Sequence, residues 1–530
     1  MKFPAWTRRG APAAGADRLE RAAQRHAAGD VDGAIELYRE ALAAEPRSVP
    51  AARALAFAWA QLGEIDQSEY FTRLALELDP SAPELHLHLG DLLQRQGRLD
   101  DALESCREAL RLAPQLALAW NNLGNVLKDL GRRGEAEAAY RDALALDAAF
   151  PEAHSNLGVL LHEAGDLAGA CSHYESALRL KPDFLQGWLN LAHLHERSGS
   201  LEGALQAYDR ALALDPGHVD ARVNRAQHLL MAGRYEEGWK EYEWRWKLAE
   251  VAAARPRFDR PQWDGRALGG EALLLYCEQG FGDAIQFVRY APLAAARGAR
   301  VLLRCPRKLK ALFAGVEGVS AVVDDSEAPP EFAFCCPLLT LPSLLGTTTV
   351  GTIPAKVPYL RAEPALAAAW KEKLAARPGL KVGLAWATDS AVGAHKSLRL
   401  DLLAPLALPG VTLYSFQRGA AAAQIAGAPP GMEVVDAARE LRDFSDDAAL
   451  LDALDLTISI DTGIAHLAGA MARPVWTLVT EPPDWRWMRE RSDSPWYPTM
   501  RLFRQGRDKD WRAPVAAMAE ALAARLGRPA

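Results

Sequence analysis

A 34-residue period in the first half of the chain constrains the fold more than any other feature of the sequence. Proline recurs with successive gaps of 34, 34, 68 and 34 residues, at Pro46, Pro80, Pro114, Pro182 and Pro216. Alanine keeps the same interval at Ala41, Ala75, Ala109, Ala143, Ala177 and Ala211. A period held over so many positions predicts a solenoid in which each unit packs on its neighbours.

The residues within one period indicate a pair of helices. Gly124 is followed by Ala136 and Tyr140, and the next period repeats this spacing. Small residues let the two helices of a hairpin approach closely, aromatic residues fill the space between hairpins, and proline ends the second helix. The pattern resembles the tetratricopeptide repeat. We expect about seven units over residues 15–252, the last degenerate because Arg245 stands where alanine is expected.

Asparagine also repeats at the 34-residue interval, in the first helix expected of four units: Asn122, Asn156, Asn190 and Asn224. A carboxamide both donates and accepts hydrogen bonds, so a ladder of these side chains can hold the backbone of an extended peptide. Asparagine is also common at this position of tetratricopeptide repeats, which leaves a purely structural role open. A solenoid is usually a binding surface, so we expect a protein to bind on its concave face.

Beyond a linker at residues 253–270 the period stops, and short apolar runs alternate with helical segments, which is typical of α/β domains. We expect two Rossmann-like domains, at residues 271–365 and 379–527, with the connection around Ala362–Gly379. The first domain is predicted to contain strands Leu273–Cys277, Val301–Cys305 and Ser320–Val323 and a helix Asp283–Arg297. The second is predicted to contain strands Lys381–Trp386, Val411–Phe416, Glu433–Val435, Leu456–Ile460 and Pro474–Val479. Such sheets bind ligands beyond the carboxyl ends of their strands.

The predicted strand Leu273–Cys277 of the first domain leads into a glycine-rich turn that runs from Glu278 to Asp283. It is not the dinucleotide-binding turn, because Ile285 replaces the third glycine of G-x-G-x-x-G. Two glycines let the backbone approach a substrate, and Asp283 at the helix start can accept a proton from an attacking hydroxyl. A carboxylate there also serves as a helix cap, and both interpretations stay open.

A second motif follows the predicted strand Leu456–Ile460. The strand runs into Asp461, Thr462 and Gly463, and then into a helix of small residues that contains His466. The free N–H groups at the start of such a helix suit a diphosphate or another anion. Asp461 or Thr462 can equally be a simple cap.

Together the two motifs resemble those of the GT-B glycosyltransferases of the heptosyltransferase-like family, whose members carry a G-x-G-D turn and a D-[ST]-G-x-x-H segment. The resemblance covers roughly residues 270–525. It implies that Asp283 is the catalytic base and that Lys396, in the loop after the first strand of the second domain, contacts phosphate. It also implies a reaction without metal or cofactor, in which the nucleotide sugar is held by Asp461, Thr462, Gly463 and His466.

The order of parts, with repeats ahead of a GT-B region, is also similar to that of the protein O-GlcNAc transferases, in which an asparagine ladder holds the acceptor polypeptide. The donor motif is closer to the heptosyltransferase type, so the architecture does not identify the sugar. Resemblance to bacterial proteins of this build makes flagellin one candidate acceptor.

Two further groups of residues allow alternative interpretations. The aromatic residues in 484–487 and 496–497 suit either stacking on a nucleotide base or packing in a core. The acidic pairs lack the spacing of a D-x-D metal motif, and we expect them to be solvated; they are Asp324-Asp325 and Asp446-Asp447.

Composition limits the partners and the compartment. A net charge of −7 and a pI near 6.0 argue against wholesale binding of nucleic acid. The six cysteines contain no C-x-x-C pair, and the sequence suggests neither a secretion signal nor a membrane-spanning helix. We therefore expect a cytoplasmic protein that does not insert into a membrane.

The sequence thus predicts an all-α tetratricopeptide solenoid followed by two α/β Rossmann-like domains of the GT-B type. The expected function is transfer of a sugar from a nucleotide donor to a Ser/Thr hydroxyl of a protein held by the repeats. Two alternatives remain: a non-catalytic interaction scaffold with a degenerate GT-B region, and a glycosyltransferase that acts on a glycan or a lipid.

Overall fold

The computed structural model describes residues 14–391 and 393–527. The chain divides after Leu194 into two compact units, which are described in turn.

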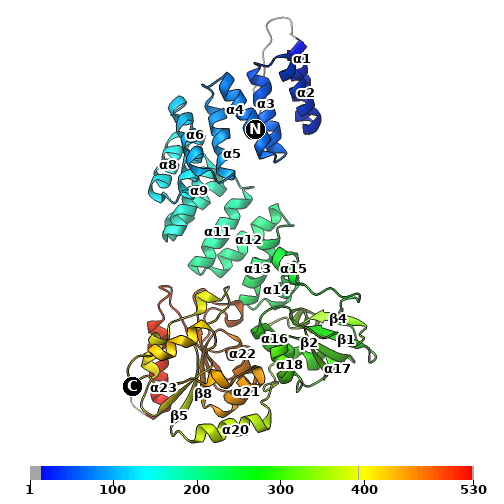
Figure 1. The fold of residues 1–530 in the computed structure, drawn as a ribbon, viewed down its shortest axis with the longest axis vertical. Helices are drawn as coiled ribbons and strands as arrows, with labels where there is room; N and C mark the ends of the chain where they lie inside the picture. The colour runs from blue at the N-terminus through cyan, green and yellow to red at the C-terminus, as the bar shows by residue number, and fades with distance from the viewer. Residues whose placement is uncertain (1–13, 392, 528–530) are drawn as a thin grey trace. The chain divides into compact units, whose positions relative to one another are not determined.

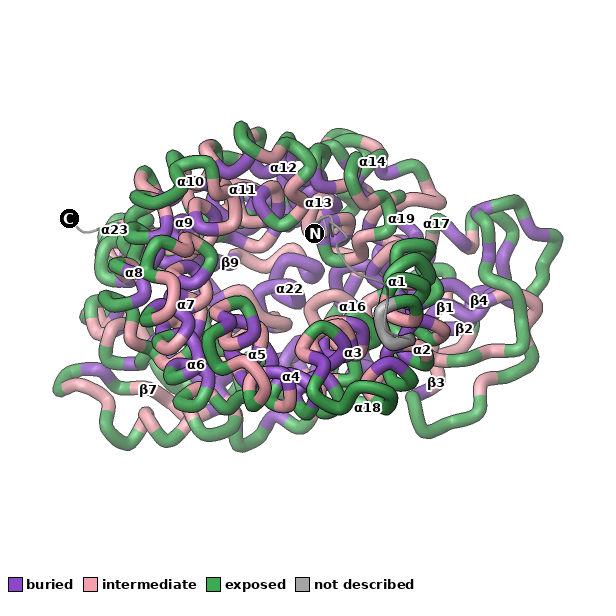
Figure 2. The backbone as a smooth tube through the Cα atoms, turned by 90° about the horizontal axis from the view of Figure 1, so that it is seen from above, coloured by how far each residue is buried: buried purple, intermediate pink, exposed green. Residues whose placement is uncertain are grey.

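The first unit consists of helices arranged in pairs (Figure 1). Its helices are α1 Ala14–Ala27, α2 Val31–Ala44, α3 Val49–Gln61, α4 Ile65–Leu78, α5 Pro83–Arg95, α6 Leu99–Leu112, α7 Ala117–Asp129, α8 Arg133–Leu146, α9 Pro151–Ala164 and α10 Leu167–Leu180, followed by most of α11 Leu185–Ser198. Each helix from α2 to α10 carries a buried stripe and an exposed one, as Figure 2 shows for α5 and α7. The predicted tetratricopeptide solenoid is therefore confirmed.

The 34-residue period also has a cause in the backbone, namely one glycine per repeat in the left-handed conformation. A glycine with φ between +75° and +89° follows the first helix of every pair: Gly29, Gly63, Gly97, Gly131, Gly165, Gly199 and Gly233. Only glycine adopts this left-handed conformation without steric cost, so the turn into the second helix is fixed by one residue per repeat.

A second set of glycines permits close approach of the paired helices. A Cβ atom added to Gly124 in α7 would lie 2.5 Å from the Tyr140 ring in α8, and one added to Gly158 would lie 2.7 Å from the Tyr174 ring. Both rings are fully buried. In these two repeats the spacing of glycine and tyrosine therefore reflects one packing contact.

Gly124→Ala is expected to lower the free energy of unfolding by about 1–3 kcal/mol, because the buried Tyr140 ring must move away from the added methyl group. The matched control is Gly134→Ala in the neighbouring helix α8, where no atom lies within 4 Å of the new Cβ. That change is expected to be neutral or to stabilise by up to about 1 kcal/mol. Urea denaturation of the full chain, followed by helical circular dichroism, checks both values; equal effects would contradict the packing explanation.

The second unit begins with the last repeats and continues into two parallel sheets. Its repeat helices are α12 Leu201–Leu214, α13 Val219–Met231 and α14 Tyr235–Tyr242, followed by the 3-10 turn η1 Glu243–Lys247 and α15 Ala249–Ala254.

The first sheet has the strand order β3-β2-β1-β4, and all its pairs are parallel. Its strands are β1 Ala272–Tyr276, β2 Arg300–Cys305, β3 Val319–Asp324 and β4 Phe334–Pro337. The predicted single helix at Asp283–Arg297 is wrong in detail, because α16 Phe281–Phe287 and α17 Ala291–Ala296 are separated by the 3-10 turn η2 Val288–Tyr290. Pro292 at the start of α17 favours a new helix start there. The remaining elements are α18 Arg307–Phe313, η3 Leu338–Thr340, α19 Leu341–Leu344 and η4 Val350–Thr352.

The second sheet has the strand order β10-β9-β8-β5-β6-β7, again parallel throughout. Its strands are β5 Leu380–Ala385, β6 Val411–Ser415, β7 Val434–Val435, β8 Leu456–Ile460, β9 Val475–Val479 and β10 Met500–Arg504. Its helices are α21 Phe444–Ala453, α22 Gly463–Ala470 and α23 Arg512–Arg525, and its 3-10 segments are η5 Ala394–Lys396, η6 Leu400–Leu406, η7 Ala420–Gly427, η8 Ala437–Glu440 and η9 Trp485–Trp487. The expected connection around Ala362–Gly379 contains the helix α20 Pro364–Ala375.

Both strand orders contain a point at which the chain direction across the sheet reverses. In the first sheet it lies between β1 and β4, and in the second between β5 and β8. Loops that leave such neighbouring strands diverge, and the space between them is where open α/β sheets bind ligands. The two sequence motifs follow β1 and β8, so both stand at these reversal points.

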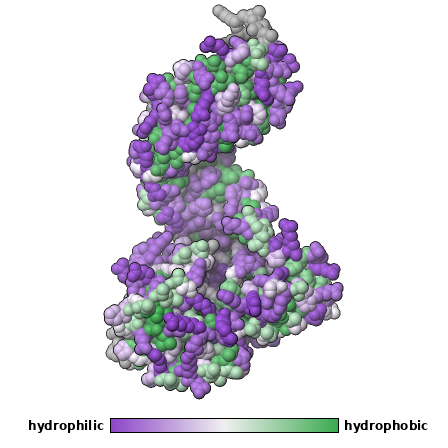
Figure 3. Space-filling view, in the orientation of Figure 1, coloured by the Kyte–Doolittle hydropathy of each residue, from purple (hydrophilic) through white to green (hydrophobic). Residues whose placement is uncertain are grey.

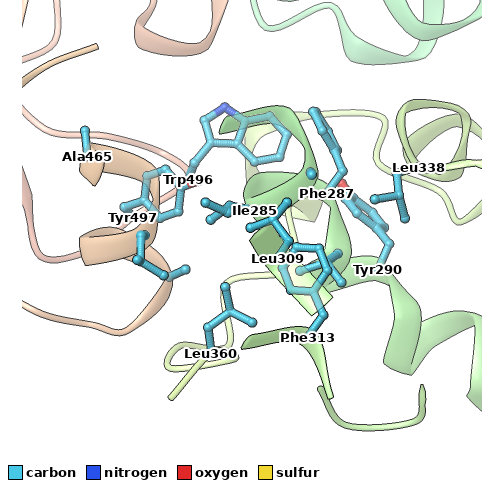
Figure 4. Close-up of a cluster of buried hydrophobic side chains, with 14 of the residues drawn as sticks. Ile285, Phe287, Tyr290, Leu309, Phe313, Leu338, Leu360, Ala465, Trp496 and Tyr497 are labelled. Carbon is cyan, nitrogen blue, oxygen red and sulfur yellow. The ribbon is translucent and has the colours of Figure 1, made fainter. Parts of the chain in front are cut away.

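One apolar core extends across the second unit. It includes Trp239 of α14, Phe287 of α16, and Trp485 and Tyr497 of the second α/β domain. Figure 4 shows Trp496 and Tyr497 beside Ile285 and Phe287, which come from the other domain. The two α/β domains and the last repeat therefore share buried side chains.

The visible surface is mainly hydrophilic, with hydrophobic residues scattered in small groups (Figure 3). Among the helices of residues 14–391 and 393–527, none combines the length and the apolar character needed to cross a membrane.

Candidate active site

The two sequence motifs meet at the contact between the α/β domains. The Phe281 ring at the start of α16 packs 5.0 Å from the Phe444 ring of α21, measured between centroids. A Cβ atom added to Gly282 would lie 2.8 Å from Cδ2 of His466 in α22. Glycine at this position therefore allows the turn that precedes Asp283 to contact the Asp461–His466 motif, and Figure 2 shows α22 as an almost wholly buried helix.

Lys396 and Asp461 form an ion pair at the reversal point of the second sheet. Lys396 follows β5 and Asp461 follows β8, and the Lys396 ammonium donates to Asp461 Oδ2 at 2.5 Å. The two side chains are 22% and 9% exposed. Burial by itself raises the pKa of Asp461, but the hydrogen bond from His466 and the charge of Lys396 more than offset this and hold the pKa well below its usual range. Asp461 is therefore a carboxylate.

His466 is held between Asp461 and the apolar core. Its Nε2 lies 3.6 Å from Asp461 Oδ1, and its Nδ1 shares a hydrogen bond of 2.8 Å with the hydroxyl of Tyr497. The fully buried Tyr497 thus fixes the orientation of the ring. Thr462 contributes through its backbone, because its carbonyl accepts the N–H groups of Ala465 and His466.

Asp283 has two partners in this structure. Its Oδ2 accepts a hydrogen bond of 3.0 Å from the backbone N–H of Gly280, which caps the start of α16. Its Oδ1 accepts from the guanidinium of Arg486, which comes from the other α/β domain. The capping role is thus present, and the carboxylate is at the same time tied to the second domain.

Arg486 is the central cation of the site. Its Nη1 donates to Asp484 at 3.0 Å and 3.1 Å, and its Nε donates to the buried Gln286 at 2.7 Å. Burial by itself lowers the pKa of Arg486, but the negative charges of Asp484 and Asp283 more than offset this and raise the pKa. The guanidinium stays charged and links the two domains.

The charges of the site determine what it can bind. Three carboxylates, Asp283, Asp461 and Asp484, share the cations Lys396 and Arg486. A diphosphate that reached these cations would replace carboxylate partners with its own oxygens. Among the described residues no cluster of His, Cys, Asp or Glu has the arrangement of a metal site.

The aromatic segment after β9 packs in the core. Trp485 lies 5.3 Å from Trp239 of α14, and Trp496 lies 5.8 Å from Phe287, both measured between ring centroids. Both tryptophans, and Trp487 with them, are almost fully buried. Packing, rather than stacking on a base, is the role that these contacts support.

The expectation that the acidic pairs are solvated is wrong for three of the four residues. Asp447 is fully buried, where Arg418 pairs with it at 2.8 Å, and Asp446 is 6% exposed beside Arg442. Asp324 is also buried, and Asp325 alone is exposed. The sequence did not reveal the arginine and turn partners that make burial of these carboxylates tolerable.

The asparagines of the ladder are half-buried and already hydrogen-bonded. In the first unit, Asn156 donates to Asn121 at 2.9 Å and to Asn125 at 3.0 Å, and Asn190 donates to Ser155 at 3.1 Å. Asn122 accepts a hydrogen bond of 3.4 Å from its chain neighbour Asn121. In the second unit, Asn224 bonds to Tyr208. Asn156, Asn190 and Asn224 therefore join helices of neighbouring repeats, whereas the bond of Asn122 stays within α7.

Sequence reasoning missed Gln286 and gave Asp484, Arg486 and Tyr497 no polar role at the site. Asp484 and Arg486 are charged residues within an aromatic segment, and this pattern could have indicated a buried ion pair. Nothing local to Tyr497 indicated its bond to His466, because the two residues are joined only by the fold.

Comparison with known proteins supports the two-part organisation. Residues 25–86, 81–149, 121–183 and 189–238 match tetratricopeptide-repeat models. Residues 428–507 match the model "Glycosyltransferase family 9 (heptosyltransferase)". This match includes Asp461, Thr462, Gly463 and His466, whereas Lys396 and Asp283 lie outside it.

Protein FlbA of Caulobacter vibrioides is 32% identical over an alignment of 333 residues that covers 56% of this chain and 54% of FlbA, so the chain spans about half the length of this curated relative. Among solved structures, the Cut9–Hcn1 assembly of the APC/C is 19% identical over 43% of this chain and 45% of that chain, with a TM-score of 0.39. YrrB, described as a TPR protein with an unusual peptide-binding site, is 23% identical over 35% of this chain and 95% of that chain, with a TM-score of 0.28. The two structural likenesses are too weak to bear on function. By its family matches, the chain combines tetratricopeptide repeats with a glycosyltransferase family 9 domain.

Proposed function

We propose that the protein is a glycosyltransferase that transfers a sugar from a nucleotide donor to a protein acceptor bound by its repeats. The observation that carries the proposal is the meeting of the Gly280–Asp283 turn with the Asp461–His466 motif across two α/β domains. Sheets of this type place ligands at the reversal points from which both motifs start. The family 9 match over residues 428–507 supports the same activity.

In the proposed mechanism, the donor diphosphate binds near Lys396 and the start of α22, and these groups stabilise the negative charge that develops as the sugar leaves. Asp461 and His466 orient Lys396 and the helix start, while Gly463 lets the phosphate approach the backbone. Asp283 removes the proton from the acceptor hydroxyl. For Asp283 to act as a base, its contact with Arg486 must loosen, and a bound diphosphate is a suitable competing partner for that arginine. The chain's own residues supply every role, so we propose a metal-independent reaction.

The acceptor is proposed to be a protein with a reactive Ser or Thr hydroxyl, because tetratricopeptide repeats commonly bind polypeptides. Flagellin is one acceptor to assay. The six cysteines are free, which suits a reducing cytoplasm. A glycan or lipid acceptor remains the alternative for an active enzyme, and a pure scaffold remains the alternative for an inactive one.

The test is a transfer assay with purified protein, a panel of labelled nucleotide sugars, and candidate acceptor proteins that include flagellin. We expect one donor to raise the melting temperature and to label a Ser or Thr residue, as located by mass spectrometry. Labelling of a glycan or lipid alone would assign a different acceptor. No thermal response to any nucleotide would favour the scaffold.

The asparagine ladder is expected to decide whether the repeats select the acceptor. Each carboxamide can contribute about 0.5–1.5 kcal/mol to peptide binding, so a single change is hard to detect. Replacing all four ladder residues by Ala is expected to abolish transfer to the full-length acceptor and to spare the slow transfer to a short hydroxyl-bearing peptide. It is also expected to lower stability, because Asn156, Asn190 and Asn224 already bond to neighbouring helices.

A matched control replaces four exposed residues that keep the same 34-residue interval on the second helices, without changing the net charge: Arg107, Arg141, Glu175 and Asp209, all to Ala. This variant is expected to retain both activities. Equal loss of both activities in the ladder variant would assign the ladder a structural role, and unchanged activities would place acceptor binding elsewhere.

A further inference from the structure

Arg245 departs from the repeat pattern at a buried position. In the preceding six units the same position is a buried alanine, from Ala41 to Ala211 at 34-residue intervals. In the last unit it is Arg245, whose side chain is only 1% exposed. A guanidinium in a core is strongly unfavourable unless it is paired, so the partner of Arg245 explains the departure.

The partner is Glu278, the first residue of the Glu278–Asp283 turn. Arg245 Nε donates to Glu278 Oε2 and Nη2 donates to Oε1, both at 3.0 Å, and the Glu278 side chain is also 1% exposed. The other N–H groups of Arg245 donate to the Tyr242 carbonyl, to Glu243 and to Thr340. All five guanidinium N–H groups therefore have an acceptor, which gives the pair a single geometry.

The contacts continue along the turn residue by residue. Glu278 Oε1 also accepts the backbone N–H of Leu339 at 3.1 Å, and Gln279 Nε2 donates to the hydroxyl of Tyr242 at 3.4 Å. The next residue, Gly280, donates its N–H to Asp283. Arg245 and Tyr242 of the last repeat thus hold Glu278 and Gln279, which directly precede Gly280.

The same repeat also contacts the far end of α16. Trp239 packs 5.8 Å from the Phe287 ring and 5.3 Å from the Trp485 ring, which directly precedes Arg486. Residues of α14 and the turn η1 therefore contact both the turn before α16 and Phe287 at its end. Between these two points, Asp283 of α16 contacts Arg486.

We propose that Arg245 and Glu278 are positioning residues, through which the last repeat holds the Glu278–Asp283 turn in the geometry that presents Asp283 to the acceptor. The proposal rests on the proposed role of Asp283 in transfer. It predicts that the repeats contribute to turnover independently of acceptor capture.

The test combines hydrogen–deuterium exchange with steady-state kinetics of the full chain. Arg245→Met is expected to raise the exchange rate of the 278–285 amides at least tenfold and to lower kcat at least tenfold, with the donor KM unchanged. Arg245→Lys keeps the charge and loses the two-pronged contact, so its exchange rate and kcat are expected to lie between those of Arg245→Met and the unchanged protein. Should Arg245→Met fail to fold, Arg245→Lys provides the same comparison.

The matched control is Asp447→Asn, which weakens another ion pair between a buried carboxylate and a two-pronged arginine, in the second domain. It is expected to lower the melting temperature without changing exchange at 278–285. Unchanged exchange in a folded Arg245 variant would overturn the proposal, and so would faster exchange with unchanged kcat in an active enzyme. If the unchanged protein transferred no sugar, the proposed function would fail, while exchange would still show whether the ion pair holds the turn.

Discussion

Asp283→Asn is expected to lower kcat by roughly 10²–10⁴-fold, the usual loss when a general base is removed. Asparagine keeps an oxygen that can accept the Gly280 N–H, so the start of α16 is retained. The affinity for the donor is expected not to fall, because Lys396 and Asp461 belong to the other α/β domain and the loss of the Asp283 charge leaves Arg486 freer to bind the diphosphate. Steady-state transfer kinetics and donor titration calorimetry measure the two quantities separately.

Asp484→Asn is the matched control for this experiment, because it removes the other carboxylate paired with Arg486. If Asp283 acts as the base, kcat falls far less in Asp484→Asn than in Asp283→Asn. Equal losses would show that the charge balance around Arg486, and not a proton acceptor, is what both changes disturb. An active Asp283→Asn enzyme would remove Asp283 from the catalytic role.

Lys396→Ala is expected to abolish the stabilisation that a bound nucleotide sugar provides, which is about 2.7 kcal/mol when the ligand is present at a hundred times its Kd. It is also expected to lower the free energy of unfolding in the absence of ligand by about 3 kcal/mol, because Asp461 loses its ammonium partner in a nearly buried position. Thermal and urea denaturation, each with and without the nucleotide sugar, measure both effects.

Two further variants separate binding from stability. Lys396→Met combined with Asp461→Asn removes both charges, so unfolding free energy is expected to recover most of the loss while donor binding stays absent. Lys373→Ala breaks the exposed pair with Glu440 and is expected to cost about 0–1 kcal/mol without affecting the donor response. A donor response retained by Lys396→Ala would show that the phosphate binds elsewhere.

The repeats were predictable because their spacing is imposed by packing that recurs in successive units. The Gly124 and Tyr140 contact returns at Gly158 and Tyr174, and each copy reinforces the signal. The strands β4 and β10 were missed for local reasons. Phe334–Pro337 is short and contains a proline at its end. Met500–Arg504 includes two arginines, Arg501 and Arg504, which obscure a strand whose three apolar residues are buried.

The site was predictable in part for a similar reason. The glycines and acids after β1 and β8 are local signals of a turn into a helix, so the sequence alone indicated Asp283 and Asp461 as candidates. The bonds from Arg486 to Asp283 and from Tyr497 to His466 join residues far apart in the chain, and no periodicity links them. For Arg245 the sequence predicted part of the arrangement. It showed that Arg245 replaces the alanine of the earlier repeats, but it did not indicate the partner Glu278.

The shared core of the second unit bears on how the protein can be divided. A fragment that starts at the first strand of the α/β region would lack Arg245 and Trp239, exposing Phe287 and Trp485 and leaving Glu278 in an apolar setting without its counter-charge. Such a fragment is expected to aggregate or to unfold readily. The smallest autonomous piece that contains both α/β domains should therefore begin no later than α13, so a shortened protein freed of the preceding repeats must still keep the last one.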